Sequence, residues 1–196
     1  RPFTVLMPES YRAAHEHGVE RYLATGESTL LGSVRQVEGL RKDGTVFPAE
    51  CSISAYRSNG DVVFTAVLRD VTERRRAEER TRLLAVALES VADPVCITDT
   101  AAAIQYVNDA FSRQNGYDIA EVLGKNPRML KSGQTDPAVY AALWQALTAG
   151  RVFSGTVVNR RKDGSTYAAA LTTAPVRDAF GTVSHYLATH RDVTEQ

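Results

Sequence analysis

The second half of the chain alternates apolar and polar residues over several short segments, which is the pattern of half-buried β-strands. The predicted strands are Pro94–Thr98, Ile104–Asn108, Val152–Arg160, Tyr167–Val176 and Thr182–Arg191. The first half repeats the last three of them, at Val34–Leu40, Thr45–Tyr56 and Val62–Arg69. Turns rich in Asp, Asn and Gly separate these segments, so each half predicts a three-stranded antiparallel meander.

Between the early and the late strands of the second half, the pattern becomes helical. Short helical pieces are predicted within residues 109–130, and a longer helix over Pro137–Ala149. Asp136 is a typical N-cap, Pro137 suits the first helical position, and Gly150 supplies the left-handed residue that ends such a helix. The predicted fold class is α+β, a five-stranded antiparallel sheet with helices on one face.

Two motifs occur twice in the same order, which indicates an internal repeat. Arg41–Phe47 (RKDGTVF) recurs 120 residues later as Arg161–Tyr167 (RKDGSTY). Arg69–Glu73 (RDVTE) recurs 122 residues later as Arg191–Glu195. The chain is therefore expected to contain two copies of one domain.

The two copies are unequal, because fewer residues precede the RKDG turn in the first copy than in the second. By comparison of the repeats, we expect about thirty residues of the first copy to be missing from this piece of chain. The predicted organisation is residues 1–72 for the C-terminal part of the first domain, 73–91 for a helical connector and 92–196 for the second domain.

The connector, Glu73–Val91, has an apolar seam with alternating spacings of four and three residues. Its members are Ala77, Thr81, Leu84, Leu88 and Val91. Arginine and glutamate residues surround the seam, a pattern typical of a coiled coil. One interpretation is an amphipathic helix that packs on its own domain. We favour the other, a parallel two-stranded coiled coil that makes the protein a homodimer.

Composition narrows the function. Lys plus Arg equals Asp plus Glu at 23 each, which argues against a nucleic-acid-binding module. No apolar run is long enough to cross a membrane, so we expect a cytoplasmic chain. Cys51 and Cys96 have no CxxC spacing and are expected to be buried free thiols. The chain has no GxGxxG fingerprint and no catalytic Ser/His/Asp set, so we do not expect an enzyme within it.

The predicted elements resemble the PAS fold, the sensor domain of many signalling proteins. The Asp-Val-Thr-Glu sequence at the end of each copy resembles the PAS boundary motif, where the domain passes into its output helix. Asn108–Phe111 and Gly116-Tyr117 also match PAS positions. The resemblance covers essentially the whole chain and implies a tandem of PAS domains joined by the connector.

The second copy resembles the flavin-binding PAS domains of NifL-type redox regulators and related sensor kinases. The matching stretches are 124–126, 142–144, 158–163, 171–176 and 190–192. The resemblance implies FAD, or FMN, in a slot contacted by Asn126, Trp144 and Asn159. Each residue also has a structural alternative: Asn126 could stabilise a turn, Trp144 could pack helix against sheet, and Asn159 could cap a strand edge.

Residues 124–130 further resemble the flavin segment of light-sensing LOV domains. In that family, the residue after the asparagine is the photoreactive cysteine, whereas this chain has Pro127. Proline has no thiol, so a cysteinyl–flavin adduct at this position is excluded. Pro127 also replaces the acidic or polar residue that many flavin relatives carry there, which weakens a proton relay through this site.

The first copy resembles the haem-binding PAS domain of FixL-type oxygen sensors, through residues 7–12, 15, 21–22, 30–32 and 35. That resemblance implies His15 as the axial iron ligand and Arg35 as the distal donor to bound oxygen. Cys51 stands where this family is expected to have a bulky aliphatic residue. We therefore treat haem as the alternative, and expect no metal site, with His15 an exposed histidine of a helix.

Taken together, these features predict the sensory module of a larger regulator, with a histidine kinase or a cyclic-dinucleotide enzyme as its output. The module would sense redox state or oxygen through a flavin in the second domain and pass the signal through the connector helix. The alternatives are a cofactor-free PAS pair for dimerisation or small-ligand sensing, and a haem-based oxygen sensor through the first domain.

Overall fold

A computed structural model describes residues 3–28 and 31–194 of the chain. It divides into two compact units, Arg1–Arg82 and Leu83–Gln196, and the division falls within helix α2 (Thr72–Ser90). The predicted connector therefore lies across this division. The predicted domain bounds stay a prediction, and Leu30 and Glu195, which belong to the motifs above, lie outside the described residues.

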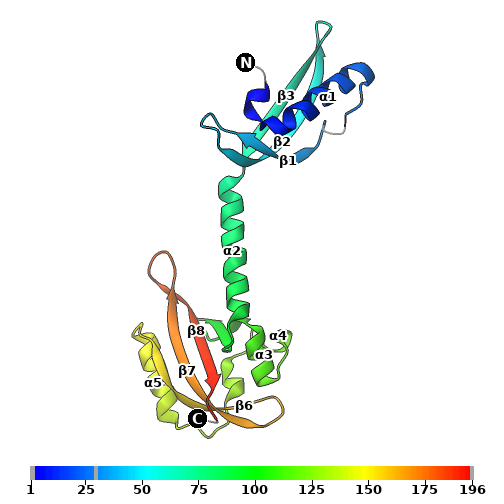
Figure 1. The fold of residues 1–196 in the computed structure, drawn as a ribbon. Coiled ribbons are helices and arrows are strands. Elements are labelled where there is room, and N and C mark those ends of the chain that lie inside the picture. The colour runs from blue at the N-terminus through cyan, green and yellow to red at the C-terminus, as the bar shows by residue number, and fades with distance from the viewer. Residues whose placement is uncertain (1–2, 29–30, 195–196) are drawn as a thin grey trace. The chain divides into compact units, whose positions relative to one another are not determined.

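The first unit is a helix beside an antiparallel meander. Its elements are η1 (Phe3–Leu6), α1 (Glu9–Thr25), β1 (Val34–Leu40), β2 (Val46–Ser58) and β3 (Asp61–Asp70). The strands pair in the order β1-β2-β3 (Figure 1). Gly44 in the KDG turn has a φ of +86°, a backbone conformation that favours glycine and lets β1 return as β2. The predicted meander is confirmed.

The second unit contains a five-stranded antiparallel sheet within the described residues, in the order β5-β4-β8-β7-β6. Its strands are β4 (Val95–Asp99), β5 (Ile104–Val107), β6 (Phe153–Arg160), β7 (Thr166–Arg177) and β8 (Val183–Asp192). Its helices are α3 (Asp109–Asn115), α4 (Ile119–Val122), η2 (Pro127–Leu130) and α5 (Pro137–Thr148). The first and last strands of the unit, β4 and β8, lie side by side, so the sheet closes around the helical segment between them.

The helix ends follow the capping residues that the sequence predicts. The Asp136 side chain accepts a hydrogen bond from Ala138 N at 2.8 Å, and Pro137 takes the first position of α5. Gly150 follows the helix with a φ of +68°. The predicted long helix and the α+β class are confirmed, and no helix among the described residues is long and apolar enough to cross a membrane.

The apolar core of the second unit lies between the helices and one face of the sheet. Its fully buried members are Cys96, Ile104, Val107, Phe111, Val122 and Leu130. A second cluster, Val157, Tyr167 and Ala169, packs beneath α5. The helices therefore cover the same face of the sheet from both ends, as the sequence predicts.

Asn108 anchors the end of α2 to the second unit. Its side chain is fully buried, and Oδ1 accepts hydrogen bonds from Val95 N at 2.9 Å and Phe111 N at 3.1 Å. Its Nδ2 faces the carbonyl oxygens of Leu88, Val91 and Asp93 at 3.1–3.3 Å. One amide thus links the connector to β4 and α3.

We predict that Asn108→Ala lowers the free energy of unfolding of this unit by about 3 kcal/mol, because it leaves several buried backbone groups without partners. Chemical denaturation measures the loss. Asp136→Ala is the control, since it removes one helix cap and should cost about 1 kcal/mol. Equal losses in the two variants would show that Asn108 is an ordinary cap.

Candidate ligand-binding cavity

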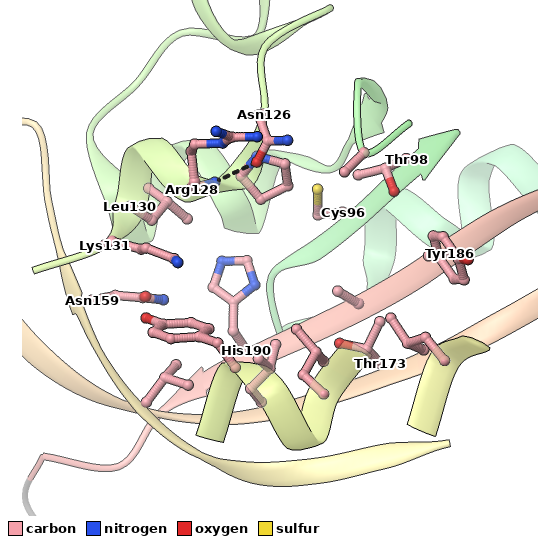
Figure 2. Close-up of a pocket in the computed structure, with 18 of the residues that line it drawn as sticks. Cys96, Thr98, Asn126, Arg128, Leu130, Lys131, Asn159, Thr173, Tyr186 and His190 are labelled. Atoms are coloured by element: carbon pink, nitrogen blue, oxygen red, sulfur yellow. Dashed lines mark hydrogen bonds between the residues drawn. The ribbon is translucent and has the colours of Figure 1, made fainter. Parts of the chain in front are cut away.

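The second unit contains a cavity of about 360 Å³ between the helices and the inner face of the sheet. Every strand of the sheet except β5 contributes to it, together with α3, η2 and α5 (Figure 2). Along β8, the alternate residues Tyr186, Ala188 and His190 face the cavity, as the period of two in a strand requires. A volume of this size suits a small organic ligand.

Most of the cavity wall is apolar, and it comes from segments far apart in the sequence. The apolar lining residues are Cys96, Ala102, Phe111, Pro127, Leu130, Leu143, Leu147, Val157, Leu171 and Ala188. Polar groups are few and gather at particular points of the wall. Such a surface suits a largely apolar ligand that is oriented by a few hydrogen bonds.

The structure brings the three predicted cofactor residues together on the wall of this cavity. Asn126 also caps η2, because its Oδ1 accepts a hydrogen bond from Arg128 N at 3.0 Å. Trp144 is 44% exposed and meets the ring of Tyr186 edge-on, with centroids 6.1 Å apart. Asn159 is buried on β6. Their contact with a cofactor stays a prediction.

His190 is buried at the polar end of the cavity, and its ring stands up into the cavity (Figure 2). Its Nε2 lies 3.2 Å from Asn115 Nδ2, and the ring packs edge-on against Phe111 at a centroid distance of 5.3 Å. Burial lowers the pKa of His190 to about 4, so the imidazole is neutral at physiological pH.

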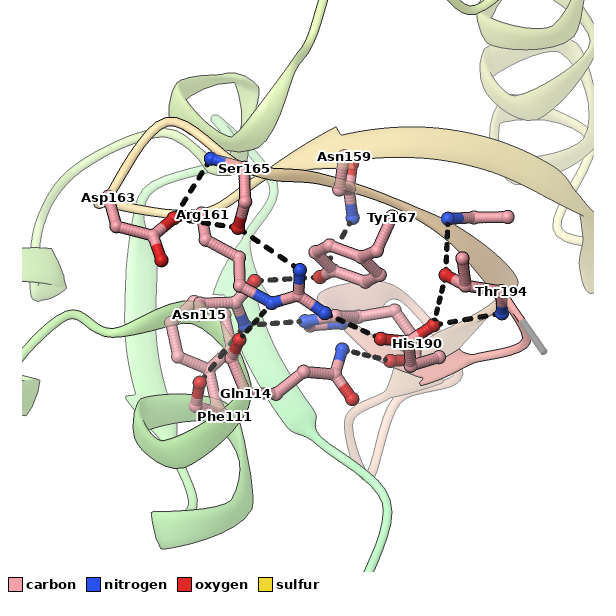
Figure 3. Close-up of polar contacts among 12 residues, drawn as sticks. Phe111, Gln114, Asn115, Asn159, Arg161, Asp163, Ser165, Tyr167, His190 and Thr194 are labelled. Carbon is pink, nitrogen blue, oxygen red and sulfur yellow. Dashed lines mark hydrogen bonds and ion pairs between the residues drawn. The ribbon is translucent and has the colours of Figure 1, made fainter.

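A short chain of buried hydrogen bonds extends from His190 along the sheet (Figure 3). Tyr167 Oη donates to Asn115 Oδ1 at 2.7 Å, and Asn159 Nδ2 donates to Tyr167 Oη at 3.4 Å. Burial raises the pKa of Tyr167, so its hydroxyl keeps the proton that it donates. The network thus holds Asn159 and His190 at the same end of the cavity.

Two basic residues also line the cavity. Lys131 Nζ lies 3.8 Å from the centroid of the Tyr140 ring, and Arg128 belongs to η2. Lys131 forms an isolated bridge with Asn159, which places the backbone of the two residues side by side. The basic groups favour a ligand that carries a negative charge, such as a phosphate.

Two further lining residues bear on cysteine chemistry. Pro127 lines the cavity at the position of the photoreactive cysteine in the LOV family, so no thiol is present there. Cys96 lines it from β4, and burial raises the pKa of its thiol to about 12, which keeps it protonated. The predicted burial of Cys51 and Cys96 as free thiols is confirmed.

An arginine clamp joins the cavity network to the end of the domain. Arg161 pairs with Asp192 at 2.6 Å, donates to Gln114 O at 2.9 Å and lies 4.4 Å above the Tyr167 ring (Figure 3). Asp192 in turn accepts the backbone N–H of Thr194 at 3.0 Å.

The first unit repeats this arrangement. Arg41 pairs with Asp70, which also accepts the backbone N–H of Thr72 at 2.9 Å. The hydrogen bonds from Thr72 and the contact with Arg41 lower the pKa of Asp70 to about 2, so the pair stays charged. Both copies of the Asp-Val-Thr motif are therefore held by the arginine of the RKDG turn.

The first unit has its own cavity, of about 530 Å³, between α1 and the sheet. His15 lines it and packs against Phe3, with ring centroids 5.7 Å apart. Arg35 pairs with Cys51 across the sheet, but it is not among the described lining residues, and its Nε donates to Ser33 Oγ. The structure thus does not place the two predicted haem residues around one described cavity.

The residues that line the cavity of the second unit fit a flavin. The apolar wall suits the isoalloxazine ring, the amides of Asn126 and Asn159 suit its polar edge, and Arg128 and Lys131 suit a phosphate. Among the described residues, no group of three or more His, Cys, Asp or Glu side chains could hold a metal ion.

Sequence reasoning did not identify His190, Asn115 or Tyr167 as parts of one site. A signal existed for His190, because it continues the inward positions Tyr186 and Ala188 of a strand with a period of two. No such signal existed for Asn115, which reaches the network from a short helix 75 residues earlier.

Both units match known protein families. A family model for the PAS fold matches residues 82–193, and one for a PAS domain matches residues 1–73. The chain is 38% identical over 107 residues to the nitrogen fixation regulatory protein of Klebsiella oxytoca, covering 55% of this chain and 22% of that protein. It is 32% identical over 156 residues to the sensor protein FixL of Bradyrhizobium diazoefficiens, covering 76% and 30%.

A similar solved structure is described as "Flavin Analogue Sheds Light on Light-Oxygen-Voltage Domain Mechanism". It is 34% identical, with a TM-score of 0.53, and the match covers 57% of this chain and 85% of that one. The chain spans between 22% and 30% of the length of the two curated relatives above. The predicted presence of two sensor-type domains is confirmed.

The low pKa of His190 predicts acid sensitivity of the second unit. In the unfolded chain the imidazole of His190 is protonated below the ordinary histidine pKa of 6.5. In the folded chain it stays neutral until about pH 4. Stability is therefore full above pH 6.5 and falls by about 3 kcal/mol in total as the pH drops to 4. Denaturation of the wild type and His190→Gln across this range measures the difference.

His185→Gln is the matched control, because His185 lies on the same strand with its side chain on the opposite face. It should keep the acid sensitivity of the wild type, whereas His190→Gln should lose it. A His190→Gln variant that loses stability between pH 6.5 and 4 as steeply as the wild type would contradict the assignment.

Proposed function

The chain belongs to the PAS family, and on that basis we propose that it is the sensory part of a larger regulator that reads redox state or oxygen through a flavin. The flavin, FAD or FMN, binds in the cavity of the second domain. The chain acts as a binding module, and a histidine kinase or a cyclic-dinucleotide enzyme elsewhere in the full protein is the output.

The observation that carries this proposal is the composition of the cavity wall. The wall is largely apolar. Asn159 and His190 are buried in it, with Lys131 beside Asn159. Asn126 and Arg128 contribute further polar groups from the η2 segment. Isoalloxazine has an apolar benzenoid end and a hydrogen-bonding pyrimidine end, and its nucleotide forms carry phosphate. The similarity to a nitrogen fixation regulatory protein and to a light-oxygen-voltage domain supports the same ligand.

The visible spectrum of the purified protein tests the proposal. A yellow protein that releases FAD or FMN on denaturation is the expected result. We predict that Asn159→Ala lowers flavin affinity by about tenfold, because a hydrogen bond to a buried ring edge is lost.

Arg160→Ala is the control for this measurement, since Arg160 is the exposed neighbour of Asn159 on β6. Fluorescence titration of the flavin-free protein compares the two variants with the wild type. A colourless protein that takes up neither flavin would refute the proposal and favour a cofactor-free PAS pair. Unchanged affinity in Asn159→Ala would remove only that residue from the site.

The connector is the proposed dimer contact and signal route. Leu84 is 58% exposed on α2, and Val91 is 39% exposed just beyond its end. Leu88 is half-buried. Thr81 Oγ1 donates to Ala77 O within the helix, so this polar member of the seam needs no partner from another chain. A parallel pair of these helices would bury the leucines and give both sensor domains a common output axis.

We predict that Leu84→Glu converts a homodimer into monomers, because it places two like charges face to face in the seam. Leu83→Glu is a closely matched control, since Leu83 is 64% exposed on the adjacent position of the same helix but lies outside the seam. Sedimentation velocity measures the assembly state. A Leu84→Glu protein that remains dimeric would place the interface elsewhere.

A second candidate is haem binding by the first domain. It is favoured by the cavity of about 530 Å³ that His15 lines and by the similarity to the sensor protein FixL. An imidazole beside a largely apolar cavity suits an axial ligand of ferrous haem. A red protein whose Soret band is lost in His15→Ala would support this candidate, and retention of the band would refute it.

A further inference from the structure

The orientation of the Asn115 amide follows from its neighbours. Its Nδ2 lies 3.0 Å from the carbonyl oxygen of Phe111, which can only accept a hydrogen bond. The nitrogen end of the amide must therefore face Phe111. The oxygen end accepts a hydrogen bond from the Tyr167 hydroxyl at 2.7 Å. The reversed amide would lose the first contact, because it would set one oxygen against another.

This orientation decides the tautomer of His190. The second hydrogen of Asn115 Nδ2 points at His190 Nε2, 3.2 Å away, so Nε2 is the acceptor and carries no proton. A neutral imidazole then has its proton on Nδ1. No described residue accepts a hydrogen bond from Nδ1, although His190 is only 3% exposed, and the ring projects into the cavity (Figure 2).

Burial keeps His190 neutral, and no anion among the described lining residues opposes this effect. Nearby charged or titratable side chains from the packed elements are Cys96, Lys131 and Tyr167, with the Arg161–Asp192 pair behind Gln114. None of the described carboxylates lines the cavity, so no anion there favours the imidazolium ion. His190 thus presents Nδ1–H to the cavity, where a ligand can accept its hydrogen bond.

We propose that His190 gives the cavity a fixed hydrogen-bond donor, Nδ1–H, and thereby selects a ring ligand that presents an acceptor at this point. That the ligand is a flavin rests on the function proposed above. We place the ring nitrogen N5 of oxidised isoalloxazine at this point, because it is an acceptor in the oxidised form. Reduction adds hydrogen to N5 and turns it into a donor, which would face the His190 donor, whereas the carbonyl oxygens stay acceptors in both forms.

The cavity should therefore prefer the oxidised flavin. Binding the reduced form requires His190 to move its proton to Nε2 or to turn, and either change breaks the bond from Asn115. Because Asn115 also accepts a hydrogen bond from the Tyr167 hydroxyl, the change would reach Tyr167, whose ring lies against the Arg161 guanidinium. His190 is in this sense a specificity-determining residue that links ligand state to the polar network.

The first experiment tests the donor without any ligand. Nitrogen-15 NMR of the flavin-free chain, labelled at histidine, reports which imidazole nitrogen of His190 is protonated, with His190→Gln used to assign the signal. Protonation at Nδ1 is expected. Protonation at Nε2, or an even mixture of the two, would overturn the proposal whether or not the protein binds flavin.

The second experiment measures the preference of the cavity for oxidised over reduced flavin. It uses titration with oxidised and dithionite-reduced FMN and FAD, and the midpoint potential of the bound flavin. His190→Phe removes the donor and should weaken binding of the oxidised form by about tenfold. His190→Gln has an amide that can donate or accept, so it should keep the oxidised form and bind the reduced form about tenfold more tightly. Each tenfold shift of binding in favour of the reduced over the oxidised flavin raises the two-electron midpoint potential by about 30 mV.

His185→Gln again serves as the control and should leave both affinities and the potential unchanged. If the wild type binds flavin and the His190 variants keep its preference between redox forms, the selection is refuted while the proposed function stands. If the wild type binds no flavin, the proposed function fails, and the tautomer measurement alone decides the donor assignment.

Discussion

The contact between the Phe111 carbonyl and the Asn115 amide is the constraint on which the site depends. A backbone carbonyl can only accept a hydrogen bond, so it sets the amide in one orientation. That orientation then sets the direction of the Tyr167 hydroxyl and the protonated nitrogen of His190. A reversed group would leave buried atoms of this network unpaired, so the whole network holds one arrangement.

The same short helix that carries this amide also reaches the end of the domain. Gln114, next to Asn115, donates from Nε2 to His190 O at 2.9 Å and accepts from Arg161 through its backbone oxygen. Arg161 pairs with Asp192, whose carboxylate caps the turn at Thr194. A change in the cavity and a change at the domain exit therefore involve neighbouring residues of α3. These contacts connect the cavity wall to the end of the domain.

The two copies share this exit chemistry as well as the three-stranded meander that carries it. In each, the arginine that opens the RKDG turn holds the aspartate of the Asp-Val-Thr motif, as Arg41 holds Asp70 and Arg161 holds Asp192. The repeated motifs thus lie in contact in the folded chain, and the pairing explains why they recur together. After the first exit, Asn108 anchors the far end of α2 to the next domain, so the connector is held at its C-terminal end by side-chain hydrogen bonds.

The sequence alone determined the strands, the capped helix after Asp136, the repeat and three lining residues, because these follow from local periodicity, turn residues and family-like motifs. It did not show that His190, Asn115 and Tyr167 form one network, since these residues are brought together by the pairing of β7 with β8 and the packing of α3. The sequence also predicted that His15 and Arg35 would act at one haem site, whereas the described cavity of the first domain includes His15 and not Arg35. Hydrogen-bond partners depend on distances and directions in three dimensions, and periodicity along the chain carries neither.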